Sequence, residues 1–596
     1  MARTQMRNDD SIDPITLEVI QNGLGSIVDE MALTVMRTAY SGVVKDALDY
    51  STAFCNASGE VIAQGLTIVV HLGSFPSAVR SIMTKFAGRI YPGDMFISND
   101  PYTAGGIHLP DIYVIKPVFD ATELQGFSCV VAHHTDVGGI VPGSNSTQAT
   151  EMYQEGICLP AMKLYERGEP NDAIFDIIAR NVRVPDKVLG DLRAEIAAAN
   201  IGERAYLDLI RRYGPTTFHH YSDALLDYSE RLARAEIAAL PDGVYQATGH
   251  IDGDSIESGP VTIAVRVTIE GDELTVDFDG SSRQVKAGIN SPIAFTRSAV
   301  YGAVRLILDP AAPNSAGYFR PIHVDAPAGT VVHPVLPGAC GARGIMGFRI
   351  MDTVAHALAA VAPDRVPADG EGGNTILSMG GYDAEFNPFV YVDLIAGARG
   401  GAPWGDGAAG IPHPGSNIAN TPVEIAEVEL PIRIEEYGFA VDTGGAGQFR
   451  GAPGQIRQVR LLADEAILQM RSDKRRFRPY GLHGGNEGTP SMTVLNPGTE
   501  DRVLKTMGMT PIRKNDVVRH TLAGGGGWGA AFERDPELVR RDVWNELLST
   551  DYASVHYGVV IDPDTLEIDH DLTRRRRANS MQPRSDSAAT GSSQPD

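Results

Sequence analysis

Cysteine is scarce in this chain, whose 596 residues include only Cys55, Cys129, Cys158 and Cys340. The four lie far apart and form no CxxC pair. This pattern favours neither a disulfide framework nor a thiolate zinc site, and it fits a reducing cytoplasm. Long apolar runs are also missing, because none approaches the roughly 20 residues that cross a bilayer and the N-terminus has no apolar signal core. We therefore expect a cytoplasmic protein without a membrane span.

Positive charge is in short supply as well. The chain has 51 Lys and Arg residues against 75 Asp and Glu residues, a formal net charge of −24. Such an acidic balance argues against nonspecific binding to nucleic acid or to anionic membranes. No complete nucleotide-binding motif is present, since the glycine runs at 444–447 and 524–527 do not match GxxxxGK[ST]. We interpret these runs as turns with positive φ.

The regular patterns that are present predict an α+β fold in several domains. Apolar residues at helical spacing follow an Asp13 N-cap and Pro14, and two further helical patterns cover 186–213 and 216–239. Strict alternation over 261–269 and again over 274–278 predicts a hairpin. We expect mixed sheets, long N-terminal helices and Gly-rich turns. The expected segments are flexible residues 1–12, an N-terminal domain over 13–240, a middle α+β domain over 241–415, a mostly β domain over 416–572 and a disordered tail over 573–596.

The most informative stretch runs from residue 99 to residue 139. His108 and Asp111 lie in a Gly/Pro-bounded loop. Two apolar strand-like runs follow this loop, and the second one ends on His133. Imidazoles and carboxylates delivered by a loop and by the end of a neighbouring strand can hold a divalent metal. The alternative is two separate loops with hydrogen-bonding histidines, because HxxD alone is a weak pattern.

Several neighbours compete for places in such a site. Strand alternation sends one of His133 and His134 inward and the other to the opposite face, and periodicity does not decide which. Asp49, just before an apolar strand, could complete a set of two histidines and two carboxylates, or it could cap a turn. Asp46 and Asp136 are weaker candidates, and Asp136 could instead orient a ligand histidine.

Two other features favour structural roles. His71 follows an apolar strand and precedes a helix, so a core or capping histidine is a better interpretation than a pocket residue. The basic run at 474–478 could pair with an anionic substrate or partner, but such a run is usually a solvated face.

Long motifs in order along the chain resemble the hydantoinase B/oxoprolinase family. They include DPITLEVIQNGL, MRTAYSGVVKDALDYSTAF, VHLGSFPSAV, NDPYTAGGIHLPDI, HHTDVGG, TQATEMYQEGICLPAMKLYERG, NVRVPDKVLGDLRAEIAA, GGAGQFRGAPG and LAGGGGWG. The resemblance covers about residues 12 to 572, and its ordered blocks make it specific. The family comprises one subunit, or the C-terminal half, of ATP-dependent enzymes such as N-methylhydantoinase, 5-oxoprolinase, caprolactamase, and the acetone and acetophenone carboxylases.

The resemblance implies both a metal and a partner. Carried onto this chain, the metal positions are His108, Asp111 and His133, with Asp49 as the fourth ligand, and zinc is expected with manganese as the alternative. ATP would be bound by a hydantoinase A-like partner in a hetero-oligomer, which agrees with the missing phosphate loop.

The implied activity is that of an ATP-dependent amidohydrolase that acts on cyclic amides, with this chain as one of its subunits. The partner would phosphorylate the carbonyl oxygen of a hydantoin, oxoproline or lactam ring, and metal-activated water would open the ring. Asp136 or Glu155 would relay protons. The alternatives are a subunit of an ATP-dependent ketone carboxylase, in which the metal orients a carboxyl donor, and a non-catalytic scaffold for the ATP-binding partner.

Overall fold

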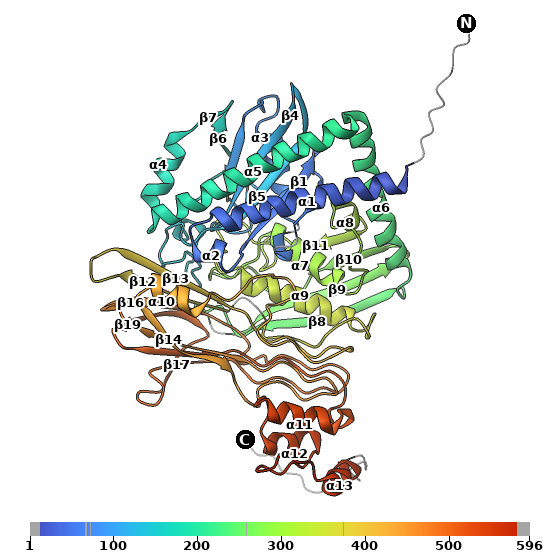
Figure 1. Ribbon diagram of the computed structural model, residues 1–596, viewed down its shortest axis with the longest axis vertical. Coiled ribbons are helices and arrows are strands. Elements are labelled where there is room, and N and C mark those ends of the chain that lie inside the picture. The colour runs from blue at the N-terminus through green and yellow to red at the C-terminus, as the bar shows by residue number, and fades with distance from the viewer. Residues whose placement is uncertain (1–11, 66–67, 72, 258, 373–374, 581–596) are drawn as a thin grey trace, which may run out of the picture.

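The N-terminal region is built on a seven-stranded antiparallel sheet (Figure 1). The computed structural model describes residues 12–65, 68–71, 73–257, 259–372 and 375–580. The sheet has the order β2–β1–β5–β4–β3–β6–β7. Its strands are β1 (Tyr50–Asn56), β2 (Val61–Gln64), β3 (Met95–Ser98), β4 (Asp111–Asp120), β5 (Glu123–His133), β6 (Met162–Glu166) and β7 (Glu169–Pro170). Apart from Ile12, the expected flexible N-terminus lies outside the described residues.

Helices cover both faces of this sheet. The long helices α1 (Pro14–Thr38) and α5 (Pro185–Tyr213) pack on one face, with α6 (Pro215–Ala238) against α1, and α3 (Phe75–Lys85) packs on the other. Alternation along β4 explains this arrangement, since Ile112 and Val114 join the core under α1 and α5 while Tyr113 and Ile115 join the core under α3. The short helices α2 (Gly42–Lys45) and α4 (Asp172–Asn181) complete the region.

The middle region contains a four-stranded sheet of order β11–β10–β9–β8. Its strands are β8 (Gly243–Ile251), β9 (Val261–Glu270), β10 (Glu273–Asp277) and β11 (Ile322–Asp325). The predicted hairpin is confirmed, because β9 and β10 pair antiparallel around Gly271, whose φ is 62°. Only β11 runs parallel to its neighbour β10. Helices α7 (Ile293–Arg305) and α9 (Gly344–Leu358) pack together beside this sheet, and α8 (Ala316–Phe319) packs on α6.

Two further antiparallel sheets follow, with the orders β13–β12–β16–β19 and β14–β15–β20–β17–β18. Their strands are β12 (Thr375–Tyr382), β13 (Pro388–Ile395), β14 (Ile432–Phe439), β15 (Gln455–Leu461), β16 (Glu465–Arg471), β17 (Met492–Leu495), β18 (Arg502–Val503), β19 (Met507–Arg513) and β20 (Val517–Thr521), with α10 (Val423–Glu429) beside β14. Because β12 and β13 share a sheet with β16 and β19, the boundary expected near residue 415 falls inside one sheet.

The described part of the chain closes with three helices at the bottom of Figure 1, namely α11 (Pro536–Trp544), α12 (Thr550–Tyr557) and α13 (His570–Ser580). The expected disordered tail from residue 573 therefore needs correction, since its first residues are helical. Thr573 is buried, and Arg577 donates hydrogen bonds to the carbonyl oxygens of Tyr557 and Arg534. These contacts could not be predicted from the polar composition of this stretch. Residues 581–596 lie outside the described residues.

Glycine-rich segments near residues 401, 445, 485 and 525 lie backbone against backbone. Gly445 N donates to Gly525 O at 2.8 Å, and Gly401 N donates to Gly526 O at 2.8 Å. A Cβ at Gly525 would stand 2.1 Å from the carbonyl oxygen of Arg399. The glycines at 444–447 and 524–527 do not have positive φ, so the interpretation of these runs as positive-φ turns is wrong. Close backbone approach is the physical reason for them.

The whole arrangement confirms the expected α+β class, with several sheets and long N-terminal helices. Within the described part of the chain, no helix combines the length and the apolar character that a bilayer crossing requires.

Candidate metal centre

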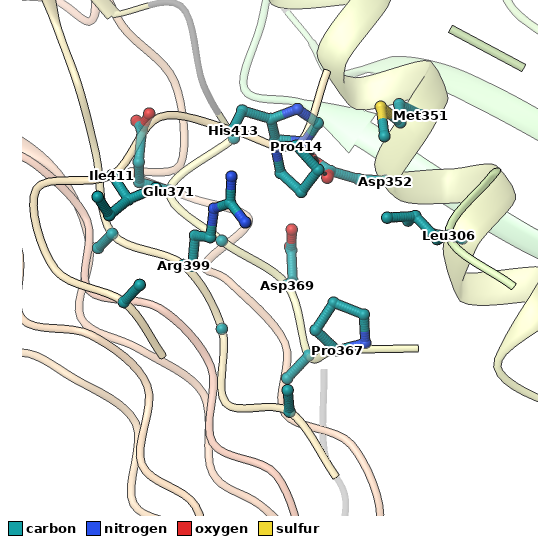
Figure 2. Close-up of a pocket in the computed structure, with 18 of the residues that line it drawn as sticks. Leu306, Met351, Asp352, Pro367, Asp369, Glu371, Arg399, Ile411, His413 and Pro414 are labelled. Carbon is teal, nitrogen blue, oxygen red and sulfur yellow. Dashed lines mark hydrogen bonds and ion pairs between the residues drawn. The ribbon is translucent and has the colours of Figure 1, made fainter. Parts of the chain in front are cut away.

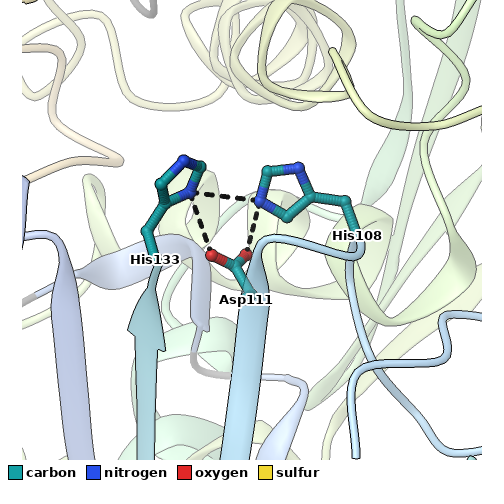
Figure 3. A group of neighbouring side chains, drawn as sticks. All are labelled: His108, Asp111 and His133. Carbon is teal, nitrogen blue, oxygen red and sulfur yellow. Dashed lines mark hydrogen bonds and ion pairs between the residues drawn. The ribbon is translucent and has the colours of Figure 1, made fainter. Parts of the chain in front are cut away.

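Two adjacent strands bring the histidine–aspartate group together. β4 begins at Asp111 and β5 ends at His133, and the antiparallel register places these two residues directly opposite each other. His108 lies in the loop that leads into β4. The Nε2 of His108 is 3.1 Å from an Asp111 oxygen and 3.2 Å from the Nδ1 of His133, which is itself 3.2 Å from the other Asp111 oxygen (Figure 3). The three side chains therefore converge on one point.

Hydrogen bonding fixes the orientation of His108. Its Nδ1 is 2.8 Å from the carbonyl oxygen of Gly341, which can only accept, so Nδ1 carries the proton and Nε2 presents its lone pair to the group. Burial, helped by the nearby charge of Arg343, lowers the pKa of His108 to about 3. A neutral, oriented imidazole is the form that binds a metal ion.

Asp111 is held as a carboxylate although it is fully buried. Burial alone would raise its pKa, but His108 and Arg343 hold the pKa well below its usual range. The Arg343 guanidinium pairs with the carboxylate directly and lies over the Phe295 ring at 4.1 Å. Arg343 precedes α9, far away in sequence, and sequence reasoning missed it because no local motif marks it.

A cavity of about 20 Å³, enough for one water molecule, adjoins the group. Asp49 lines it, with a carboxylate oxygen 3.8 Å from the Nδ1 of His133. His71 lines it too, with Nε2 4.0 Å from Asp111 and Nδ1 2.9 Å from the Ser51 hydroxyl. His71 therefore lies beside the histidine–aspartate group.

Many of the other residues that line the cavity are apolar, and they come from several regions of the chain. They include Ile68, Val70, Phe295, Phe348, Ile376, Leu394 and Ile418. Arg471 and Asn145 are among the cavity's polar lining residues, and Arg471 donates to the Asn145 side-chain oxygen at 3.1 Å. Sequence reasoning found neither residue. Burial lowers the pKa of Arg471 to about 9, with Arg343 adding to the effect.

His133 and His134 have different surroundings in the structure. His134 points away from the group, and its Nε2 lies 2.8 Å from a carboxylate oxygen of Glu195 on α5. Asp46 is the half-buried C-cap of α2, and burial raises its pKa. The structure therefore brings His133 into the group, and it gives His134 and Asp46 other surroundings.

The two carboxylates expected to relay protons have other contacts. Asp136 accepts hydrogen bonds from the backbone N–H groups of Gly138 and Gly143 and from both the backbone and the side chain of Arg183. Each of its two oxygens accepts two hydrogen bonds, and the relay role stays a prediction. These contacts support a role in holding the loop after β5.

Glu155 accepts from the backbone N–H groups of Cys340, at 3.0 Å, and Gly341, at 2.5 Å. Burial raises its pKa to about 8. Because Gly341 is also the residue whose carbonyl orients His108, Glu155 acts on the group through the 340–341 turn. Its contacts make it a positioning residue, and a relay role stays a prediction.

The residues present fit a divalent metal ion. His108, Asp111 and His133 each offer one ligand atom, and these atoms all lie within 4.8 Å of one another. Two imidazole nitrogens and a carboxylate oxygen are donors that zinc and manganese accept. The hydrogen bond to His108 and the ion pair to Asp111 are the outer contacts that metal ligands usually have.

The fold and this group define an α+β protein with a candidate His₂Asp metal centre at the ends of two inner strands of its first sheet. The sequence profile of hydantoinase B/oxoprolinase matches residues 13–531, and the chain belongs to that family. It is 33% identical to a Pseudomonas sp. (strain NS671) protein that is provisionally named as one subunit of a D-/L-hydantoinase, with 95% of this chain and 98% of that protein covered. It is 31% identical to the beta chain of the caprolactamase of Pseudomonas jessenii, over 95% and 99% of the two chains.

Two solved structures share the fold of this chain. The crystal structure of the ATP-dependent caprolactamase from Pseudomonas jessenii matches with a TM-score of 0.88 at 30% identity, covering 95% of this chain and all 100% of that chain. A nucleotide-free acetone carboxylase matches with a TM-score of 0.87 at 19% identity, covering 95% and 83% of the two chains. At that identity the second likeness shows a shared fold.

Proposed function

We propose that this chain is the metal-bearing subunit of an ATP-dependent enzyme that opens cyclic amides. The observation that carries the proposal is the convergence of His108, Asp111 and His133, within 4.8 Å, in a chain whose relatives include hydantoinase and caprolactamase subunits. We further propose that a hydantoinase A-like partner binds ATP and phosphorylates the carbonyl oxygen of the ring. The phosphorylated amide, a far better electrophile, would then be hydrolysed at this chain.

His108, Asp111 and His133 would hold the ion, with Asp49 beside them as the fourth ligand. Zinc is the first choice, and manganese is the alternative. A bound divalent ion supplies a Lewis acid that lowers the pKa of water to near 7 and so provides hydroxide at neutral pH.

The remaining residues prepare the site. Gly341 keeps the Nε2 of His108 turned inward, and Arg343 keeps Asp111 ionised. Phe295 and Phe348 close one side with apolar surface, which limits the access of bulk water to a reactive phosphorylated intermediate.

Metal analysis and reconstitution test this function together. The chain is co-purified with its ATP-binding partner, its metal content is measured by mass spectrometry, and ATP turnover is followed with hydantoins, 5-oxoproline and lactams. We expect one ion per chain and amide-dependent ATP hydrolysis, both lost in the His108→Ala/His133→Ala variant. His323→Ala, at an exposed histidine of β11, is the control and should change neither.

Other outcomes would identify other functions. Turnover that requires a ketone and bicarbonate would assign the chain to the carboxylases. Stoichiometric metal that survives in the double variant would refute the metal centre. Full activity without bound metal, in the wild type as well as in the double variant, would leave only a scaffold role.

A further inference from the structure

A second and larger cavity, of about 370 Å³, lies between α9 and the loop that follows β13. Figure 2 shows Met351 and Asp352 on one side and Arg399, Ile411 and His413 on the other. A volume in this range fits a small organic molecule. The cavity is distinct from the metal centre, because Phe348, which lines the metal cavity, and His413, which lines this one, form a ring contact at 4.7 Å between the two.

Three carboxylates of this wall already have side-chain partners. Asp352 is 2.7 Å from the His413 ring, and Asp406 is 2.6 Å from Arg534. Asp369 pairs with the ammonium group of Lys474. Lys474 is buried, so the expectation that the basic run at 474–478 is a solvated face is wrong for this residue. The fourth carboxylate, Glu371, is buried and accepts a hydrogen bond from the Thr375 hydroxyl.

The arginines of the wall have a different set of partners. Arg399 donates through Nε to the Pro412 carbonyl oxygen at 2.9 Å, and Arg365 donates to the Ile307 carbonyl oxygen at 2.6 Å. Arg305 donates to the Ala312 carbonyl oxygen at 3.2 Å. Among the described residues, none of the three forms an ion pair with a carboxylate. A carbonyl oxygen satisfies a donor without neutralising its charge, so each of these three guanidinium groups keeps its positive charge.

Arg399 is the residue best placed to use that charge. It is half-buried, burial lowers the pKa of its guanidinium, and it forms no ion pair within the described part of the chain. An anion that reached its terminal nitrogens would form charge-assisted hydrogen bonds in a poorly hydrated setting, where such bonds are strong.

The rest of the wall is apolar. Met351, Pro367 and Ile411 line it, and Trp404, which is 68% exposed, lies at the opening. A large exposed aromatic ring beside a cavity offers stacking area to a ligand at low entropic cost.

We propose that this cavity binds a small organic carboxylate with an apolar body. The carboxylate pairs with Arg399, and the body packs against Trp404, Ile411 and Pro367. This is a second ligand site, beyond the proposed hydrolytic centre, and it would accept either a ring-closed amide that carries a carboxylate or a ring-opened acid.

Calorimetric titration of the full chain tests the site. The probes are benzoate, benzamide, which has the same ring without the charge, and acetate, which has the charge without the ring. We expect saturable binding of benzoate, with benzamide and acetate at least tenfold weaker. Arg399→Gln and Trp404→Ala should each weaken benzoate binding at least tenfold, while Arg80→Gln, at an exposed arginine of α3 that lines a different cavity, should not.

Two further arms make the test decisive. Benzoate should bind equally well to the His108→Ala/His133→Ala variant, so loss of the metal centre and loss of this site can be told apart. Displacement of benzoate by 5-oxoproline or by glutamate would distinguish a ring-closed from a ring-opened ligand, and either supports the site. Equal affinity for benzoate and benzamide, or unchanged binding in a folded Arg399→Gln variant, would overturn it.

Discussion

Replacing each of the two adjacent histidines by alanine should produce opposite effects. His133→Ala removes a candidate metal ligand from a nearly buried position beside a small cavity. His134→Ala instead breaks the buried ion pair with Glu195 on the other side of the strand. We expect the first variant to lose the metal and keep most of its stability, and the second to keep the metal and lose stability.

The magnitudes follow from the contacts. Both partners of the His134–Glu195 pair are fully buried at 2.8 Å. Removing one partner of a buried pair costs about 3–5 kcal/mol. Burial raises the pKa of Glu195 to about 7, so the orphaned carboxyl can take up a proton at neutral pH, and we expect the lower end, about 3 kcal/mol. In the metal-free chain, the His133 ring contacts Asp111 and His108, both at 3.2 Å, and Asn145 at 3.4 Å. A hydrogen bond contributes about 1 kcal/mol, and the first two contacts share the single Nδ1 position, so we expect His133→Ala to cost about 1–2 kcal/mol.

Metal content by mass spectrometry and calorimetric unfolding, both compared with the wild type, separate the two outcomes. The unfolding scans are run after exhaustive chelation, so that lost metal binding does not contribute to the stability difference. If His134→Ala loses the metal while His133→Ala retains it, the assignment of the inward-facing histidine is refuted.

Two other variants probe the buried Glu155 carboxyl and the close-packed glycine-rich segments. Because the folded-state pKa of Glu155 is raised from 4.5 to about 8, its neutral form contributes stability that is present below pH 4.5 and is lost as the pH rises through 8. Glu155→Gln should remove this loss, about 1.4 kcal/mol per pH unit, and unfolding measured between pH 5 and pH 8 would show a flatter profile than the wild type. Gly525→Ala places a Cβ 2.1 Å from the Arg399 carbonyl oxygen and should destabilise the chain by about 3 kcal/mol, whereas Gly405→Ala, with nothing within 4 Å, should not. Similar unfolding of these two glycine variants would contradict the close-packed arrangement.

Local patterns predicted the regular elements well. The Asp13 cap with Pro14 marks the start of α1, and strict alternation marks β9 and β10. The same patterns failed where tertiary contacts decide. β12 and β13 lie in a Gly-rich stretch with few regular signals, and they are strands because they pair with each other and with β16.

The candidate site was predictable only in part, for a related reason. Spacing and strand ends identified His108, Asp111 and His133, because all three lie within one stretch of sequence. The residues that prepare them come from elsewhere. Arg343 reaches Asp111 from a position 232 residues further along the chain, and no local pattern reports such a contact.

The origin of these residues suggests how the centre is assembled. The candidate ligands belong to the first sheet, Gly341 and Arg343 come from the turn that leads into α9, and Arg471 comes from β16. Asn145, just after the ligand stretch, connects β16 to this region. Its backbone oxygen accepts a hydrogen bond from Gln469 at 2.6 Å, and its side-chain oxygen accepts one from Arg471 at 3.1 Å. Ligands alone would leave His108 free to rotate and Asp111 without its compensating charge. A complete centre therefore requires three regions of the chain to be folded together, which explains why the family match extends over most of the sequence rather than over the ligand stretch alone.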